Sequence, residues 1–114
     1  MEGPKQEQQY LYLTTRGRKS GKPREIEIWF TQHNRNYYVI AEFPTSQWAQ
    51  NLQANPQVEV RVGSKNFRAM ARVISGESEP EVHRTVQELS RQKYGWGDGL
   101  IVQLTPDSNQ QLNR

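Results

Sequence analysis

Residues 58–74 read VEVRVGSKNFRAMARVI, and this stretch decides the fold. Apolar and polar residues alternate on both sides of the central GSKN, which is the period of two expected of β-strands. A short segment with glycine between two such runs predicts a hairpin, whose strands are antiparallel. A sheet built from hairpins is therefore expected, and not parallel strands joined by crossover helices.

The same pattern extends outward from this hairpin. We expect strands over YLYLTT (10–15), REIEIWF (24–30), YYVIA (37–41) and GLIVQLTP (99–106), with HNRN (33–36) as a turn. The alternation in REIEIWF places its residues on two faces: Ile26, Ile28 and Phe30 on one, and Glu25, Glu27 and Trp29 on the other.

Two helices are expected between these strands. Residues 46–56, SQWAQNLQANP, place Trp48 and Leu52 one helical turn apart before an Asn-Pro stop. A second helix is expected to begin with a capping box of Ser78 and Glu81 and to end at Gly95. The sequence thus predicts an α+β fold, an antiparallel sheet or barrel of about six strands with two helices, and excludes a Rossmann domain.

With 114 residues the chain is expected to form one domain, over residues 10–106, with poorly ordered ends at 1–9 and 107–114. Its apolar runs are far shorter than the roughly 20 residues that span a bilayer, and no signal peptide is recognisable. A cytoplasmic protein without membrane contact is expected. The chain has no cysteine and two distant histidines, so no metal site is expected.

Residues 16–24, RGRKSGKPR, hold five of the fifteen basic residues. Glycine, proline and adjacent like charges favour a loop there, and such a loop suits an anion. The phosphate motifs GxGxxG and GxxxxGK[ST] are both absent, so side chains and turn amides would hold a phosphate. The net charge of +3 permits nucleic acid, a membrane surface or an anionic small molecule. Charge alone also fits an ordinary solvated loop.

The segment LTTRGRKSGKPRE (13–25), followed by QWAQNLQANPQVEVRVG (47–63) and FRAMARV (67–73), resembles the deazaflavin-dependent nitroreductase family. The resemblance covers about residues 11–74 and implies the split β-barrel fold shared with flavin mononucleotide-binding and pyridoxamine-phosphate-oxidase-like proteins. It also implies an oxidoreductase that transfers a hydride between a reduced deazaflavin coenzyme of the F-420 type and a small organic acceptor.

The resemblance further implies which residues bind the coenzyme. Its anionic tail is expected at the loop, on Arg16, Arg18, Lys19, Ser20, Gly21, Lys22 and Arg24, where Ser20 and the Gly21 amide complete an anion nest. Its ring system is expected along Glu27, Ile28, Ala41 and Glu42, with the short helix closing one side through Trp48 and Asn51.

Two departures from the family pattern touch the ring pocket. Glu27 and Ile28 stand where relatives commonly have proline followed by leucine or valine, and the connection EFPTS (42–46) is shorter than the lysine-bearing loop of many relatives. Flavin mononucleotide, which also joins a tricyclic ring to a phosphate, is therefore an alternative cofactor. A protein of this fold that binds cofactor without turnover is a further alternative.

Other aromatic and titratable residues leave several interpretations open. Trp48 suits the core as well as a pocket, and Trp29 suits a cofactor groove or, in the expected homodimer, an interface. His33 and His83 are expected to be exposed and without a catalytic role. The remaining possible proton donors, expected to be half-buried, are Tyr37, Tyr38 and Tyr94.

No catalytic residue is assigned, because a hydride-transferring cofactor carries the difficult chemistry itself. The competing class is a single-stranded nucleic-acid binder with a basic loop and exposed aromatic residues. Five basic residues in one loop make a point contact and not a track along a strand, which disfavours nucleic acid as a partner.

Overall fold

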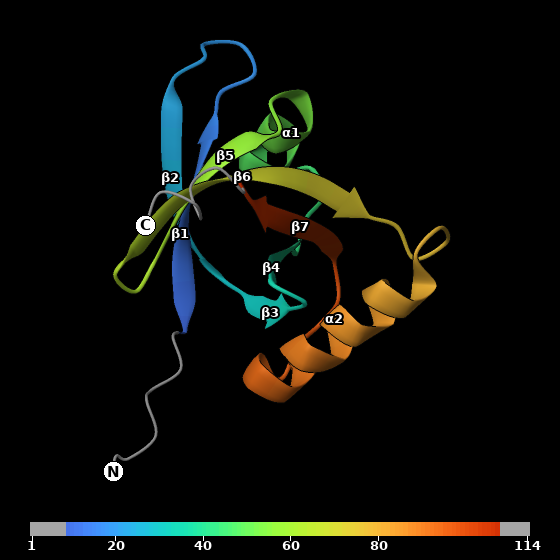
Figure 1. Ribbon diagram of the computed structural model, residues 1–114. Helices are drawn as coiled ribbons and strands as arrows, with labels where there is room; N and C mark the ends of the chain where they lie inside the picture. Colours follow the sequence, from blue (N-terminus) through green and yellow to red (C-terminus); the bar gives the residue numbers. More distant parts are fainter. Residues whose placement is uncertain (1–8, 108–114) are drawn as a thin grey trace.

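A computed structural model describes residues 9–107 (Figure 1), so the expectations about residues 1–8 and 108–114 lie outside the described residues. The elements follow in the order β1 (Tyr10–Arg16), β2 (Pro23–Trp29), β3 (Thr31–His33), β4 (Asn36–Ala41), α1 (Gln47–Ala54), β5 (Gln57–Val62), β6 (Lys65–Ile74), α2 (Pro80–Tyr94) and β7 (Leu100–Pro106). The strands form one curled sheet in the order β2-β1-β5-β6-β7-β4-β3, and every pairing is antiparallel. The predicted fold, a split β-barrel with two helices, is confirmed.

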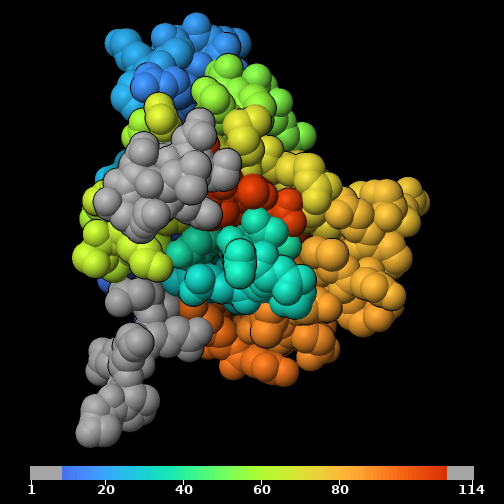
Figure 2. Space-filling model, in the orientation of Figure 1, coloured from blue at the N-terminus to red at the C-terminus, as the bar shows by residue number. Residues whose placement is uncertain are grey.

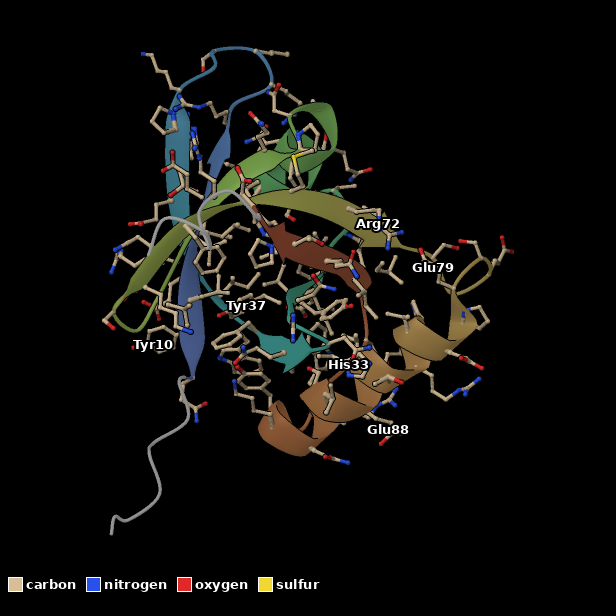
Figure 3. The ribbon with its side chains drawn as sticks, viewed as in Figure 1. Tyr10, His33, Tyr37, Arg72, Glu79 and Glu88 are labelled. Atoms are coloured by element: carbon tan, nitrogen blue, oxygen red, sulfur yellow. The ribbon has the colours of Figure 1, made fainter. Side chains whose placement is uncertain are left out.

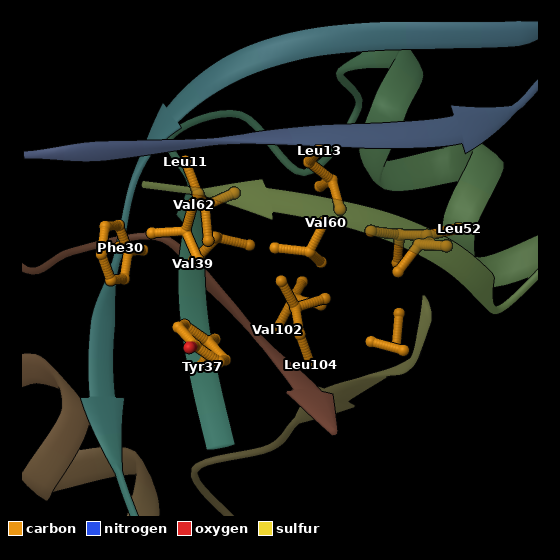
Figure 4. Close-up of a cluster of buried hydrophobic side chains, with 13 residues drawn as sticks. Leu11, Leu13, Phe30, Tyr37, Val39, Leu52, Val60, Val62, Val102 and Leu104 are labelled. Carbon is orange, nitrogen blue, oxygen red and sulfur yellow. The ribbon is translucent and has the colours of Figure 1, made fainter. Parts of the chain in front are cut away.

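The hairpin that decided the fold has the predicted register. Val58 lies opposite Ala69 and Val60 opposite Phe67. In β5 the valines are buried while the residues between them are exposed, as the period of two requires. These side chains join the main hydrophobic core inside the curled sheet (Figure 4), whose buried members are Leu11, Leu13, Phe30, Tyr37, Val39, Leu52, Val58, Val60, Val62, Ala69, Ala71, Val102 and Leu104.

The strand count differs from the prediction, because a seventh strand, β3, follows β2 after the single residue Phe30. The sequence pattern of two continues through Phe30 without glycine or proline, so nothing local marks a break. What changes is the partner: β2 pairs with β1, whereas β3 pairs with β4 on the opposite edge of the sheet. One stretch of chain therefore passes from one edge of the sheet to the other and brings these edges together.

The two helices lie at different places on the sheet (Figure 1). The short helix α1 contributes Leu52 to the main core and packs against β1 and β6. The longer helix α2 forms a second core on the outer face of the sheet, where Val86 packs with Tyr38, Ile74 and Ile101. Helix α2 packs over β4 and β7, and its end reaches β2 where Tyr94 stacks on Trp29, so a cleft can form between this end of the helix and β2.

The predicted capping box at the start of α2 is wrong. The helix begins after Glu79, whose side chain makes no capping hydrogen bond, and Ser78 instead donates its amide to Ser75 Oγ at 3.4 Å. The Glu79 carboxylate accepts from Arg72 Nη1 at 2.5 Å, and Figure 3 shows the two side chains reaching toward each other between β6 and α2. The predicted end is correct, because Gly95 stops the helix with a φ of 81°.

Candidate functional site

The predicted tail-binding residues gather in a basic cleft at one end of the molecule. This cleft, of about 540 Å³, is lined by Gly17, Arg18, Lys19, Ser20, Arg24, Gln47 and Asn51. The 17–22 loop and α1, far apart in sequence, form its two sides, and Figure 2 shows the blue loop beside the green helix, away from the orange α2. The loop and α1, which carry the two successive motifs of the family resemblance, thus lie side by side in the structure.

Hydrogen bonds within the loop fix its shape. The Gly17 amide donates to Lys22 O at 2.9 Å, and the Gly21 amide donates to Gly17 O at 2.8 Å. Gly21 adopts a φ of 73°, which favours glycine. The Lys22 amide donates to Ser20 Oγ at 3.1 Å, which leaves the Ser20 hydroxyl proton free to donate elsewhere. The Gly21 amide therefore closes the turn and is not offered to an anion, whereas Ser20 keeps a donor at the cleft.

Asn51 of α1 holds the loop against the helix. Its side chain is 3% exposed, and its Oδ1 accepts from the Arg18 backbone amide at 3.2 Å and from Arg18 Nη1 at 2.8 Å. Gln47 Oε1 accepts from the same guanidinium nitrogen at 3.0 Å. Arg18 is therefore oriented by neutral amide oxygens, which leave its positive charge uncompensated.

The cleft is strongly positive. Arg18, Lys19 and Arg24 line it without any acidic residue. Within residues 9–107, none of the five basic residues of the 16–24 stretch lies within 4.0 Å of a carboxylate oxygen. Three cations held next to one another without a counterion are suited to bind a polyanion.

A second cleft, of about 500 Å³, lies further along β2 and is mainly aromatic. Its lining residues are Tyr10, Glu27, Ile28, Trp29, Phe30, Thr31, Tyr38, Ile40, Glu42, Ser90, Tyr94 and Trp96. Of the residues predicted to contact the ring system, Glu27, Ile28 and Glu42 lie here. Strand β2 connects the two clefts, because Arg24 lines the first and Glu27 the second.

The end of α2 shapes this aromatic cleft. Trp29 stacks on Tyr94 with ring centroids 4.4 Å apart and planes 2° apart. The Tyr94 hydroxyl accepts from the Phe30 amide at 3.0 Å, and Phe30 O accepts from Lys93 Nζ at 2.9 Å. These bonds satisfy the backbone amide and carbonyl of Phe30. Phe30 lies where the chain stops pairing with β1 and begins to pair with β4. No sequence pattern indicates this role of Tyr94, because 64 residues separate the partners.

Five predicted residues, Gly21 of the turn among them, lie outside both clefts. Ala41 is buried in β4, and Trp48 packs against the main core, which is the structural alternative for this tryptophan. Arg16 Nη1 donates to Gly21 O at 3.1 Å, and Lys22 is exposed at the end of the turn. Helix α2, and not the predicted α1, closes the side of the cleft that holds Glu27 and Glu42.

The candidate proton donors differ in their surroundings. Tyr37 and Tyr38 are buried, more deeply than predicted, and burial raises the pKa of Tyr37 above its ordinary value. The Tyr38 hydroxyl accepts from Gln103 Nε2 at 2.8 Å. His33 and His83 are half-buried and not exposed as predicted; the ring of His83 lies next to Gly76. Neither histidine lines a cleft described above.

Glu27 also acts on its neighbour across the strand pair. Tyr12 lies opposite it in β1, and the Glu27 carboxylate raises the pKa of the Tyr12 hydroxyl above its ordinary value. Arg61 lies over the Tyr12 ring, 4.1 Å from its centroid, and partly opposes this effect.

The part of the chain that the structure describes also bears on metal binding and on membrane-spanning helices. No group of three His, Asp or Glu side chains there could hold a metal ion. No described helix is both long and apolar enough to cross a membrane.

The family model for F420H(2)-dependent quinone reductase matches residues 2–98. The chain belongs to this family, whose name agrees with the predicted deazaflavin dependence. The Mycobacterium tuberculosis protein named F420H(2)-dependent quinone reductase is 35% identical over 68 residues, which cover 56% of this chain and 46% of that protein. The chain thus spans less than half the length of this relative.

Solved structures agree on the fold. A protein described as a domain-swapped dimer is 25% identical, with a TM-score of 0.66 over 87% of this chain and 81% of that one. An F420-H2 dependent reductase is 24% identical, with a TM-score of 0.63 over 84% of this chain and 93% of that one.

Proposed function

We propose that this protein is an oxidoreductase that binds a deazaflavin coenzyme and transfers a hydride from it to a small organic acceptor. One observation carries the proposal: Arg18, Lys19 and Arg24 converge on a cleft without an acidic residue. The coenzyme tail, a phosphodiester with carboxylates, is a polyanion that matches this charge. The family and the reductase named among its relatives support the same coenzyme.

The residues of the basic cleft fit this coenzyme. Arg18, already oriented by Asn51, offers its remaining guanidinium donors to phosphate oxygens, and Lys19 adds a point charge. The Ser20 hydroxyl proton donates a further hydrogen bond. When bound, the coenzyme supplies the hydride, whereas the chain binds its tail, positions its ring and excludes water.

Strand β2 gives a direction to the bound coenzyme. Arg24 and Ile28 lie on the same face of this strand, so a tail at the first and a ring at the second would place the ring at the aromatic cleft in which the acceptor also binds. The walls of that cleft, including Trp29, Tyr94 and Trp96, shield the reacting atoms from solvent.

Titration of the purified protein with a deazaflavin coenzyme and with flavin mononucleotide, followed by ring fluorescence, tests the proposal. We expect tighter binding of the deazaflavin, because its longer polyanion engages more of the basic cleft. Tighter binding of flavin mononucleotide would support the alternative cofactor. Binding of neither, together with salt-sensitive binding of single-stranded DNA, would support the nucleic-acid alternative.

We also propose a homodimer. Large apolar side chains are exposed outside the two clefts, with Phe43 at 64% and Met70 at 47%. The solved structure described as a domain-swapped dimer supports pairing in proteins of this fold. Light scattering at micromolar concentration that gave the mass of a single chain would contradict this proposal. The cytoplasmic location stays a prediction.

A further inference from the structure

The aromatic cleft is acidic although the protein is basic. Glu27 and Glu42 line it, and its lining contains no lysine or arginine. Neither carboxylate has a lysine or arginine nitrogen within 4.0 Å anywhere in residues 9–107. The net charge of the chain is +3, so the local charge of the two glutamates is opposite in sign to the net charge. Lys93 Nζ lies beside the cleft, 4.0 Å from the ring centroid of Phe30 and 5.1 Å from that of Tyr94, so a cation would find two carboxylates and one ammonium group here.

Aromatic rings form the walls between these carboxylates. Trp29 has one face stacked on Tyr94 and remains 48% exposed, and Trp96 and Tyr10 also line the cleft. The face of an aromatic ring carries negative potential and attracts cations, most strongly in tryptophan. A planar cation can therefore stack on the rings while the carboxylates attract its charge.

A buried hydroxyl without a partner also lines the cleft. Thr31 is 6% exposed, and its Oγ1 makes no hydrogen bond to any described residue. A buried polar group is normally hydrogen-bonded, so this oxygen is suited to accept from a donor on a ligand. It is independent of the two carboxylates. A hydroxyl can donate or accept, and on a cation its partner would be an N–H group.

The geometry points to a planar organic cation that carries N–H groups as the ligand of the aromatic cleft. Its rings stack on Trp29, its charge lies near Glu27 and Glu42, and an N–H donates to Thr31. A protonated, ring-conjugated imine is the simplest member of this class. Binding itself does not depend on the proposed function, whereas the role of the cation as acceptor does.

If this cation is the hydride acceptor, its reduction to an amine needs no proton from the protein. The carbon of the C=N⁺ bond gains a hydride, the π electrons of that bond move to nitrogen, and the cation becomes a neutral amine. The reduced coenzyme supplies the hydride, is oxidised by two electrons and loses a proton to solvent.

Calorimetric titration with 9-aminoacridine, a planar cation with N–H groups, against acridine, which is neutral at slightly alkaline pH, tests the inference. We expect 9-aminoacridine to bind about tenfold more tightly or better. The double variant Glu27→Gln/Glu42→Gln should remove most of this preference, and Thr31→Val should weaken binding of 9-aminoacridine. The control Glu77→Gln removes an exposed charge outside the cleft and should change nothing.

Equal binding of the two probes, or an unchanged preference in the double variant, would overturn the inference. Titration of the same protein with the coenzyme separates the two proposals. If 9-aminoacridine binds as expected and the coenzyme does not, the cation site stands and the proposed function fails. If only the coenzyme binds, the cation site is wrong and the proposed function stands.

Discussion

The backbone amide and the guanidinium of Arg18 both donate to one oxygen, Oδ1 of the buried Asn51, at 3.2 and 2.8 Å. Because the two residues are 33 positions apart, this contact ties the basic loop to α1 and sets the width of the cleft between them. Arg18 thus has a structural role beside its proposed role in anion binding. A substitution of Arg18 would therefore affect both the structure and anion binding, so other residues have to test the anion site.

Asn51→Ala should destabilise the protein by about 1–3 kcal/mol, because the backbone amide and the guanidinium of Arg18 lose their shared acceptor. It should also weaken coenzyme binding, since Arg18 is no longer oriented. Urea unfolding measures the first effect and fluorescence titration the second. Gln47→Ala is the control, because Gln47 contributes one exposed bond to the same guanidinium and its loss should cost less than about 0.5 kcal/mol. Equal effects of the two variants would contradict the special role of Asn51.

Lys19→Ala/Arg24→Ala tests the anion site without disturbing Asn51. Each charge-assisted hydrogen bond contributes roughly 1.5–3 kcal/mol, so coenzyme affinity should fall by about two orders of magnitude or more. The stability of the free protein should stay level or rise slightly, as repulsion between like charges is relieved. Lys65→Ala/Arg84→Ala removes two exposed charges elsewhere and should leave affinity unchanged. Normal binding by the first variant would show that the coenzyme tail lies elsewhere.

Tyr94→Phe should destabilise the protein by about 1–3 kcal/mol, because the Phe30 amide loses its acceptor at the junction of β2 and β3. The ring stack with Trp29 should survive, so tryptophan fluorescence should change little. Tyr10→Phe is the matched control, since within the described residues the Tyr10 hydroxyl makes no hydrogen bond. A loss of stability in Tyr10→Phe as large as in Tyr94→Phe would refute this explanation.

The Arg72–Glu79 pair should make stability depend on pH in the acid range. The hydrogen bond from Arg72 lowers the pKa of the Glu79 carboxyl below its ordinary value of 4.5. A carboxyl with a lowered pKa in the folded state stabilises the protein above its unfolded pKa and loses this effect as pH falls through its folded pKa. Glu79→Gln should therefore flatten the decline of melting temperature below about pH 4.5. Glu77→Gln, an exposed neighbour without such a bond, should retain the wild-type profile.

Most of the fold followed from local patterns, because alternation, turns and helix stops are encoded within a few residues. The β5–β6 hairpin and the end of α2 at Gly95 are of this kind. The break at Phe30 was missed because it depends on a change of strand partner, and the capping box failed because Glu79 pairs with Arg72.

The candidate site likewise contains residues that local sequence patterns predict and residues that they do not. The basic loop was recognisable from composition, and its partner helix from the family pattern. The contributions of Thr31, Tyr94 and Trp96 were not, because they reach the aromatic cleft only through the curl of the sheet. Trp48 shows the converse: its place in the family motif suggested a pocket, whereas its side chain packs on the core.

The single residue between β2 and β3 also limits how related chains can change length. Inserting one residue at Phe30 would exchange the two faces of β3, so that Thr31 would turn away from the cleft and Gln32 toward it. Insertions and deletions should therefore be rejected at this point among homologues. They should accumulate at 42–46, where the chain has left β4 and not yet entered α1. The length of that connection can vary between relatives while the passage from one sheet edge to the other keeps its spacing.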